Sequence, residues 1–387
     1  MSDNIKVNYY DTFKCIAGDC PLTCCQEWRI GVDDHTLQKW QGVNLKANNR
    51  DGENKSGVHL CSHVKSDESG HVITLNKEKK CPFLNQDKLC RLVTELGEDY
   101  LSETCTTFPR QINTFENRVE YSLDTGCPAV VDLLNQNLNA IHFVKEGAKN
   151  PDLLYNVREM ILTLIQDENY TLTERMMIIF YALLELFEQD EITAKQVHQY
   201  TDGGHIQPLV QAIRKMRFNR LDSFWEGNEL FLDVVHNYRK QKLYVDYLEP
   251  ISVTAEGLET AYTEQVILEK AKNFERVLQP YEGLLKNYLI SEIFGNCLMP
   301  EMELEDVVVG FQWITLEYTV LKQAIFLKWL INGEGKIDYT MVRDYISVIS
   351  RVTGYEQSDI REYLENSFEE VIWEWGYLAL VIGNGKL

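Results

Sequence analysis

Apolar residues recur at helical spacing along most of the chain after residue 128. Residues 153–166 (LLYNVREMILTLIQ) and 172–189 (LTERMMIIFYALLELFEQ) place apolar side chains at positions i, i+3, i+4 and i+7, which is typical of a helix with one buried face. Thr171, directly before the second segment, is a residue type that begins helices. We therefore expect most of residues 129–387 to be helical. The same spacing continues in residues 129–141, 258–281, 308–331 and 368–382.

The first 127 residues follow a different pattern, in which polar loops separate short strand-like pieces. Residues 28–32 (WRIGV) and 71–75 (HVITL) are such pieces. Residues 112–123 (INTFENRVEYSL) predict a hairpin that turns at Glu116 and Asn117. Residues 46–57 (KANNRDGENKSG) have the Asn, Gly and Ser content of a surface loop.

These patterns predict a mainly α fold built from two domains. A chain of 387 residues exceeds the usual size of a single core. An irregular cysteine-rich region with short β-hairpins, residues 1–127, is expected to precede a multi-helix domain, residues 128–387.

Charge narrows the choice of partners. The chain has 38 basic and 59 acidic residues, a formal net charge of −21. Such a surface repels nucleic acid and anionic membranes and favours basic partners or exposed lysine and arginine side chains. We expect neither a nucleic acid nor a membrane as partner, and simple solubility is the alternative explanation of the acidic balance.

The N-terminal sequence MSDNIKVNYYDTFK lacks the basic start, apolar run and small-residue cleavage site of a secretory signal. Residues 176–187 (MMIIFYALLELF) are too few to cross a bilayer and predict a buried helix face instead. We therefore expect a cytoplasmic protein.

The ten cysteines are concentrated in the first third of the chain, and only Cys297 lies beyond residue 127. A reducing cytosol keeps ordinary thiols reduced, so a disulfide framework is not expected. Metal binding becomes the leading explanation.

Eight of these cysteines form two sets. Closely spaced thiolates repel one another and lose solvation unless a cation lies between them. At least four of the eight are therefore predicted to bind a metal or cluster, with buried structural thiols or redox partners as the alternative roles. The first set is Cys15, Cys20, Cys24 and Cys25, and the second is Cys81, Cys90, Cys105 and Cys127.

Spacing favours an iron–sulfur cluster, most simply 4Fe–4S, with zinc as the alternative. Structural zinc sites often use paired Cys-x2-Cys knuckles, and no such knuckle occurs here. Clusters tolerate uneven spacing, and a Cys-Pro step is familiar in cluster loops. A radical enzyme that uses S-adenosylmethionine would need a third cysteine at the position of Glu27. Cys-Pro steps occur at Cys20, Cys81 and Cys127, and Phe83, Leu84 and Phe108 supply apolar side chains nearby.

Two other motifs give little support for a functional site. His59, Cys61 and His63 in HLCSH would form a transition-metal clip only on an extended strand, and a solvated loop is the simpler prediction. Residues 331–337 (INGEGKI) lack both the Walker pattern and the G-x-G-x-x-G fingerprint, so they predict a turn between helices.

Taken together, the cysteine blocks resemble the flagellin lysine N-methylase (FliB) family. The Cys-Cys-x2-Trp and Cys-x2-Phe-Pro-Arg pieces make the resemblance fairly specific. It continues into residues 156–184 and more weakly into the remaining helical part. The matching blocks are YYDTFKCIAGDCPLTCCQEWRIGVD (9–33), CPFLNQDKLCRL (81–92), LGEDYLSETCTTFPRQ (96–111) and LDTGCPAV (123–130).

The resemblance implies an iron–sulfur protein that transfers methyl groups from S-adenosylmethionine to the side-chain amines of flagellin lysines. The same eight cysteines match the family's cysteine pattern, which does not say which four hold a cluster. The pattern also loosely resembles a broader group of zinc- or iron-chelating proteins, so the metal inference is firmer than the substrate inference.

Lysine methylation requires a neutral amine, because an ammonium has no lone pair to attack the sulfonium methyl. Residues near the cysteines in sequence are candidates for an aromatic lining or a base: Trp28, Tyr121, Glu27 and Glu120.

Arg110 is a candidate partner for the methionine carboxylate of the donor, with a structural ion pair as the alternative. Trp373, Trp375 and Tyr377 near the C-terminus predict core packing.

Two other functions remain open from the sequence. One is a non-enzymatic protein in which zinc or iron stabilises the N-terminal region and the acidic helical part binds a basic partner. The other, a cysteine-based redox protein, is disfavoured because Cys-x2-Cys is absent.

Overall fold

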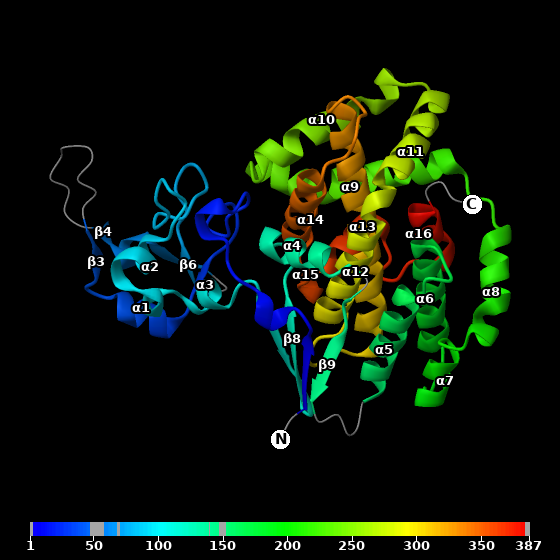
Figure 1. Ribbon diagram of the computed structural model, residues 1–387, viewed down its shortest axis with the longest axis horizontal. Helices are drawn as coiled ribbons and strands as arrows, with labels where there is room; N and C mark the ends of the chain where they lie inside the picture. Colours follow the sequence, from blue (N-terminus) through cyan, green and yellow to red (C-terminus); the bar gives the residue numbers. More distant parts are fainter. Residues whose placement is uncertain (1–2, 47–57, 68–69, 139, 147–151, 384–387) are drawn as a thin grey trace. The chain divides into compact units, whose positions relative to one another are not determined.

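The structure is a computed structural model that describes residues 3–46, 58–67, 70–138, 140–146 and 152–383. Beyond Lys46, the loop predicted at 46–57 lies outside the described residues. The chain divides into two compact units, shown in Figure 1. Unit 1 comprises residues 1–13, 112–126 and 130–387, and unit 2 comprises residues 14–111 and 127–129. The units thus alternate along the chain, whereas the sequence predicts a single boundary after residue 127.

Unit 1 is mostly helical, which confirms the predicted mainly α class. Segment 153–166 forms one helix with the predicted bounds, and the segment that follows Thr171 ends at Phe187. The helices are α4 (Pro128–Gln136), α5 (Leu153–Gln166), α6 (Leu172–Phe187), α7 (Ala194–Gln199), α8 (Gly203–Lys215), α9 (Arg220–Gln241), α10 (Val245–Ala261), α11 (Glu264–Leu278), α12 (Glu282–Asn296), α13 (Leu304–Ile331), α14 (Tyr339–Thr353), α15 (Gln357–Phe368) and α16 (Trp375–Ile382).

Helix α13 lies in the middle of unit 1 (Figure 1). Every residue from Val307 to Leu321 is buried, so this stretch has no exposed face. Helices α6, α9, α10 and α14 all pack against it. The core of unit 1 is therefore built around one helix that is buried on every side along this stretch.

Helix α6 begins at the predicted cap. The Thr171 hydroxyl accepts a hydrogen bond from the Glu174 N–H at 3.3 Å, and the Thr171 N–H donates to the Glu174 carboxylate at 2.8 Å. This capping box gives hydrogen-bond acceptors to two backbone N–H groups that would otherwise have none at the start of the helix.

Two predicted helical segments are interrupted. Segment 258–281 breaks after Ala261, and Thr263 caps a new helix, α11. Segment 368–382 contains the end of α15 at Phe368 and only then α16. Segment 331–337 is a turn between α13 and α14, as predicted.

Unit 1 also contains a four-stranded sheet in the order β7-β8-β1-β9. Strand β1 pairs parallel with β8 and antiparallel with β9. The Phe115 N–H donates to the Arg118 carbonyl at 2.9 Å, which confirms the predicted turn at Glu116 and Asn117. The strands are β1 (Asp3–Val7), β7 (Arg110–Thr114), β8 (Arg118–Leu123) and β9 (Phe143–Glu146).

Unit 2 consists of short elements around a small core. The predicted strands at 28–32 and 71–75 are shorter in the structure, as β2 and β6, and they pair with each other. The core residues are Ile30, Val32, Trp40, Leu45, Leu60, Ile73, Cys81, Phe83 and Leu92. The elements are β2 (Gly31–Val32), α1 (Asp34–Trp40), β3 (Asn44–Leu45), β4 (Val58–His59), β5 (Val64–Asp67), β6 (Gly70–Ile73), α2 (Arg91–Leu96) and α3 (Glu103–Thr107).

Among the described helices, none combines the length and the apolar content that crossing a bilayer requires. Residues 176–187 form part of α6, where most side chains are buried within unit 1.

Candidate functional site

Two turns of the same construction present two of the predicted ligands. In the first, the Asn76 side-chain oxygen accepts hydrogen bonds from the backbone N–H groups of Glu78 and Lys80, each at 2.9 Å. Lys79 has a positive φ of 58°, which lets the chain reverse. Cys81 follows directly.

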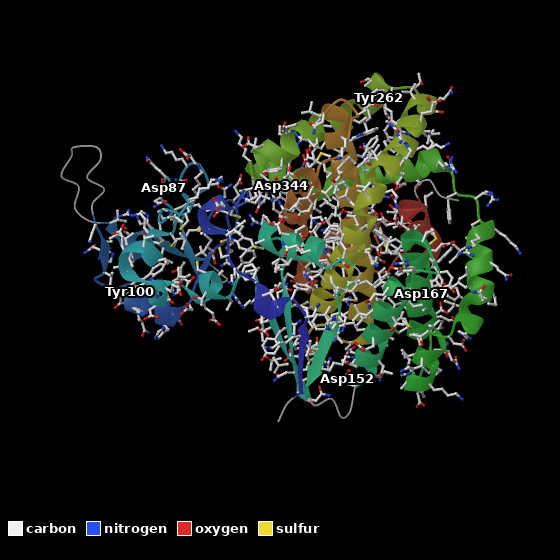
Figure 2. The ribbon with its side chains drawn as sticks, viewed as in Figure 1. Asp87, Tyr100, Asp152, Asp167, Tyr262 and Asp344 are labelled. Carbon is white, nitrogen blue, oxygen red and sulfur yellow. The ribbon has the colours of Figure 1, made fainter. Side chains whose placement is uncertain are left out.

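The second turn repeats this geometry nine residues later. The Asn85 side-chain oxygen accepts from the backbone N–H groups of Asp87 at 2.9 Å and Leu89 at 2.8 Å. Lys88 has a φ of 57°, and Cys90 follows. Asp87, at the exposed tip, is labelled in Figure 2. The repeated spacing Asn-x2-Lys-x-Cys is visible in the sequence but was not among the predicted features.

These turns bring the second set of cysteines to the first. The Cys81 N–H donates to the Cys25 carbonyl at 2.8 Å, and Gln26 pairs antiparallel with Lys80. Cys105 lies in α3, where the Ser102 hydroxyl accepts a hydrogen bond from its N–H at 3.3 Å. Segments far apart in sequence therefore present thiols to one region of unit 2.

Mutual electrostatic effects show which sulfurs lie together. Burial is the largest cause that raises the pKa of the Cys81 thiol to about 12 and that of Cys105 to about 11, and charge on Cys24 and Cys90 contributes to both shifts. Burial also raises the pKa of Cys90, and charge on Cys24 adds to it. The pKa of Cys25 is raised first by a side-chain hydrogen bond with Cys24 and then by burial. The thiol cluster defined by these effects is Cys24, Cys25, Cys81, Cys90 and Cys105.

Apolar side chains surround the thiol cluster. Trp28 and the buried Phe83 pack in the same core as Cys25, Cys90 and Cys105. In chemistry this donor set fits a thiophilic metal or an iron–sulfur cluster, which takes thiolate ligands shielded from water. As placed, however, no three His, Cys, Asp or Glu side chains in the described residues are already arranged to hold a metal ion.

The remaining predicted ligands lie differently. Cys20 donates from its sulfur to the Leu22 carbonyl at 3.1 Å, and its own carbonyl accepts from the Lys88 ammonium of the second turn at 3.3 Å. Cys15 is exposed and its sulfur accepts from the Ala17 N–H at 3.4 Å. Cys127 is buried directly before α4. None of the ten cysteines is paired in a disulfide bond.

The other residues of unit 2 that were predicted to belong to the site are Trp28, Glu27 and Arg110. The Trp28 ring meets Phe108 edge to face, with centroids 4.5 Å apart. Glu27 has a positive φ of 63°, and its carboxylate accepts from the Gln26 side chain at 3.1 Å. Arg110 is half-buried at the start of β7.

Glu120 and Tyr121 of β8 belong to unit 1. The buried Glu120 carboxylate receives two hydrogen bonds from the Arg158 guanidinium, at 2.5 and 2.7 Å, and one from Arg118 at 2.6 Å. The Tyr121 ring packs edge to face on Tyr10, with centroids 5.5 Å apart. Glu120 is thus already bound to two cations and is unsuited to act as a base.

Residues 59–63 do not form the extended strand that a metal clip would need. Leu60–His63 is a short 3-10 helix. The Cys61 sulfur points to the Leu37 carbonyl at 3.8 Å, and the His63 ring packs on Phe83 with centroids 5.7 Å apart.

A buried carboxyl pair in unit 1 was missed by sequence reasoning. Glu292 of α12 and Glu317 of α13 are 3% and 0% exposed. The Glu317 carboxylate accepts from the hydroxyls of Tyr355 at 2.8 Å and Thr353 at 2.5 Å, and also from Tyr288. No sequence pattern marks such a pair, because each glutamate lies in an apolar stretch of a different helix.

Hydroxyl and amide groups also hold Glu292. Its carboxylate accepts from the Thr125 hydroxyl and from the Asn296 side chain, the latter at 2.7 Å. Burial, followed by the charge of Glu317, raises the pKa of Glu292 to about 8. Burial likewise raises the pKa of Glu317. The pair can therefore hold a proton near neutral pH.

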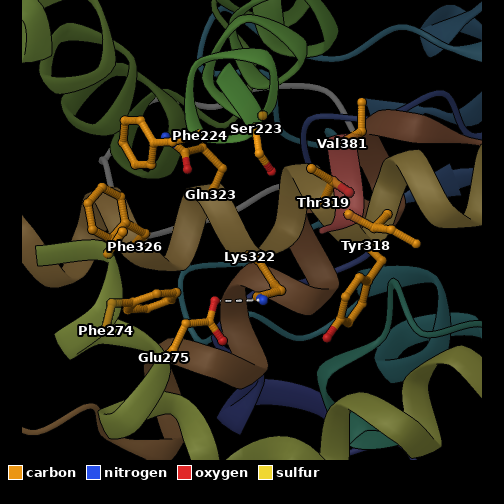
Figure 3. Close-up of a pocket in the computed structure, with 13 residues that line it drawn as sticks. Ser223, Phe224, Phe274, Glu275, Tyr318, Thr319, Lys322, Gln323, Phe326 and Val381 are labelled. Carbon is orange, nitrogen blue, oxygen red and sulfur yellow. Dashed lines mark ion pairs between the residues drawn. The ribbon is translucent and has the colours of Figure 1, made fainter. Parts of the chain in front are cut away.

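A small pocket of unit 1 contains a half-buried ion pair (Figure 3). The Lys322 ammonium lies 2.8 Å from Glu275 and 5.8 Å from the centroid of the Tyr318 ring. Burial alone would lower the pKa of Lys322, but the charge of Glu275 raises it overall. The free space is only about 20 Å³, close to that needed for one water molecule. This pocket is therefore unsuited to a cofactor of the size of S-adenosylmethionine.

Comparison with known proteins identifies the family to which this chain is related. Residues 158–381, more than half of the chain and all within unit 1, match the family described as the FliB lysine N-methylase C-terminal domain. The chain belongs to the FliB lysine N-methylase family. No solved structure matches it.

Individual FliB-family relatives match over shorter stretches. The chain is 30% identical to a "Lysine-N-methylase" from Salmonella choleraesuis over 142 residues and to another from Salmonella typhimurium over 130 residues. Each match covers 33% of this chain and 31% of the relative, so it spans about a third of the length of these methylases. A "Flagellar biosynthetic protein FliU" from Salmonella muenchen is 30% identical over 135 residues, which cover 75% of its length.

Proposed function

We propose that this protein is a protein-lysine N-methyltransferase that moves methyl groups from S-adenosylmethionine to lysine side chains of flagellin. The observation that carries this proposal is the FliB family match over residues 158–381. The names of the relatives, lysine-N-methylase and flagellar biosynthetic protein, support both the proposed reaction and the proposed substrate.

The proposed transfer is a single displacement. The lone pair of a neutral lysine amine forms a bond to the methyl carbon, while the bond between that carbon and the sulfonium sulfur breaks. The products are a methylated ammonium and S-adenosylhomocysteine, and one proton then leaves the nitrogen. Because the chain must accept lysine as a neutral amine, it has to desolvate that amine or supply a base.

We further propose that four members of the thiol cluster bind a 4Fe–4S cluster, with zinc as the alternative. Support comes from the convergence of Cys24, Cys25, Cys81, Cys90 and Cys105, and from the paired turns before Cys81 and Cys90. When bound, such a group would offset part of the negative charge of its thiolate ligands and fix the surrounding loops. The role predicted for Arg110 toward the carboxylate of the donor stays a prediction.

The substrate proposal is tested by intact mass. Purified flagellin is incubated with the protein and S-adenosylmethionine, and we expect a mass gain in steps of one methylene per transfer. Flagellin without the protein, and flagellin whose lysines have been acetylated, serve as controls. Unchanged flagellin mass together with methylation of another lysine-rich protein would contradict the substrate and retain the reaction.

The cluster proposal is tested on protein purified without oxygen. Iron and acid-labile sulfide in equal amounts, with broad absorption near roughly 400 nm, are expected of a cysteine-ligated cluster. Zinc without sulfide would favour the alternative. Replacing Cys90 by serine should lower the bound iron, whereas the same change at Cys297, which donates to the Val307 carbonyl in unit 1, should not.

A further inference from the structure

A groove in unit 1 is lined by aromatic rings and has free space of about 390 Å³. It lies among α6, α8 and the start of α16. Tyr181, Tyr200 and Trp375 provide its rings, and Ile206 and Leu209 of α8 provide an aliphatic wall.

The rings are held in place, and that of Tyr181 is also open to a ligand. The Trp375 indole N–H donates to the Met177 carbonyl at 2.9 Å. The Tyr200 ring meets His205 edge to face, with centroids 5.4 Å apart. Tyr181 is 37% exposed, which is unusual for a large aromatic side chain on a helix that is otherwise mostly buried.

One carboxylate is fixed inside this groove. Glu185 accepts a hydrogen bond from the Tyr200 hydroxyl at 2.6 Å. Burial raises the pKa of Tyr181, and the charges of Glu185 and Glu188 raise it further, so both carboxylates act on the groove. Among the described residues that line it, there is neither lysine nor arginine to neutralise Glu185.

We propose that this groove binds a lysine-bearing segment of a partner protein, with the alkyl stem against the aromatic rings and the ammonium beside Glu185. Lysine alone among side chains joins a long flexible apolar stem to a compact cation. Aromatic faces and a nearby carboxylate attract such a cation. A purely apolar segment would offer no positive charge to the Glu185 carboxylate. The inference rests on the proposed function, because it assigns a docking surface for the lysine-bearing substrate.

The test measures binding without any methyl donor. The probe is a synthetic amphipathic helical peptide with one lysine in its apolar face, and its match carries norleucine at that position. Intrinsic fluorescence of Trp375, identified by comparison with Trp375→Phe, and calorimetry report binding to the full chain. We expect the lysine peptide to bind about tenfold more tightly than the norleucine peptide, the size of a partly desolvated cation–π and carboxylate contact.

Variants separate the two parts of the groove. Glu185→Gln should abolish the preference for lysine, and Tyr181→Ser should weaken both peptides about fivefold, as loss of an aromatic contact does. Phe187→Ser removes an exposed ring from the same helix and Glu229→Gln removes a charge from α9. Neither residue lines the groove, so both controls should bind like the wild type.

Several results would overturn the inference. They are equal affinity for the two peptides, a lysine preference that survives Glu185→Gln, and a dimer of this chain that dissociates in Tyr181→Ser and excludes both peptides. Failure of the proposed function looks different. Lysine-selective binding without methyl transfer would contradict the function alone, and normal flagellin methylation by Tyr181→Ser and Glu185→Gln would contradict this inference alone.

Discussion

Glu292 and Glu317 lie in the core of unit 1 with hydroxyl and amide donors around them. Burial makes ionisation of either carboxyl group costly, and each ionised group opposes ionisation of the other. A neutral carboxyl group needs only hydrogen bonds, which this site supplies. The folded state therefore favours protonation of the pair.

Stability should for this reason fall as pH rises. The pKa of Glu292 is raised from 4.5 to about 8 in the folded state, so its stabilising effect is complete below the unfolded pKa and is lost as pH rises toward 8. Between pH 5 and pH 8 we expect a loss of free energy of unfolding on the order of 3 kcal/mol, since one pKa unit corresponds to about 1.4 kcal/mol.

Glu292→Gln should flatten this dependence. Urea unfolding followed by far-ultraviolet circular dichroism at several pH values measures it. Glu229→Gln, on the surface of α9, should leave the pH dependence unchanged. A wild-type protein that gains stability between pH 5 and pH 8 would contradict the prediction.

Glu120 illustrates why proximity in sequence to the cysteines is a weak guide. Its carboxylate binds Arg158 and Arg118 inside unit 1. Glu120→Leu leaves both guanidinium groups without this anion, so we expect a loss of about 3–5 kcal/mol in the free energy of unfolding. Denaturant titration checks it.

An exposed pair provides the control for Glu120. Lys145 and Glu159 form an ion pair near the surface, and Glu159→Gln should cost at most about 1 kcal/mol. If Glu120→Leu remained as stable as the wild type but lost methyl transfer, Glu120 would have a direct role in the reaction instead.

At the scale of elements, the two turns before Cys81 and Cys90 explain how a loop-rich region holds its thiols. Each turn uses one asparagine side chain to bind two backbone N–H groups, so the cysteine that follows starts from a fixed backbone. The spacing of the cysteines alone predicted a metal-binding region but not the asparagine-stabilised turns before Cys81 and Cys90.

Asn85→Ala removes the side-chain acceptor of the second turn. We expect it to weaken metal binding about tenfold, as loss of a group that orients a ligand does. Metal content after dialysis against a graded chelator measures the effect. The matched control is Asp167→Ala, because Asp167 binds the Asn169 N–H at 3.0 Å in a similar turn of unit 1 and is labelled in Figure 2. Unchanged metal retention in Asn85→Ala would contradict the role given to the turn.

Helices were predictable where one face is buried, and less so elsewhere. The bounds of α5 and the cap of α6 followed from periodicity and from Thr171. The break after Ala261 was missed because the apolar spacing continues across it in α11. Strands β1 and β8 pair although they lie more than a hundred residues apart in the sequence. No local sequence pattern predicts such a contact.

The whole molecule joins units of very different construction. Unit 1 has long helices around α13, whereas α1, the longest helix among the described residues of unit 2, has seven residues. The small core of unit 2 includes Cys81 and is contacted by Cys25, Cys90 and Cys105. A bound metal should therefore contribute much of the stability of unit 2 and little of that of unit 1.

Metal removal should affect the two units unequally. After chelation, we expect proteases to cleave within residues 14–111 while the helical circular dichroism signal, which comes mainly from unit 1, changes little. Limited proteolysis with mass mapping, compared with untreated protein, checks this. Equal loss of helical signal and of protease resistance in both units would contradict it.

Burial of α13 on every side has a consequence during synthesis. Helices α6, α9 and α10 leave the ribosome before residues 304–331 are made, and their apolar faces have no permanent partner until then. Such exposed surfaces favour aggregation and chaperone binding. A nascent chain stalled before residue 304 should therefore stay bound by chaperones, and one released after residue 331 should begin to escape them.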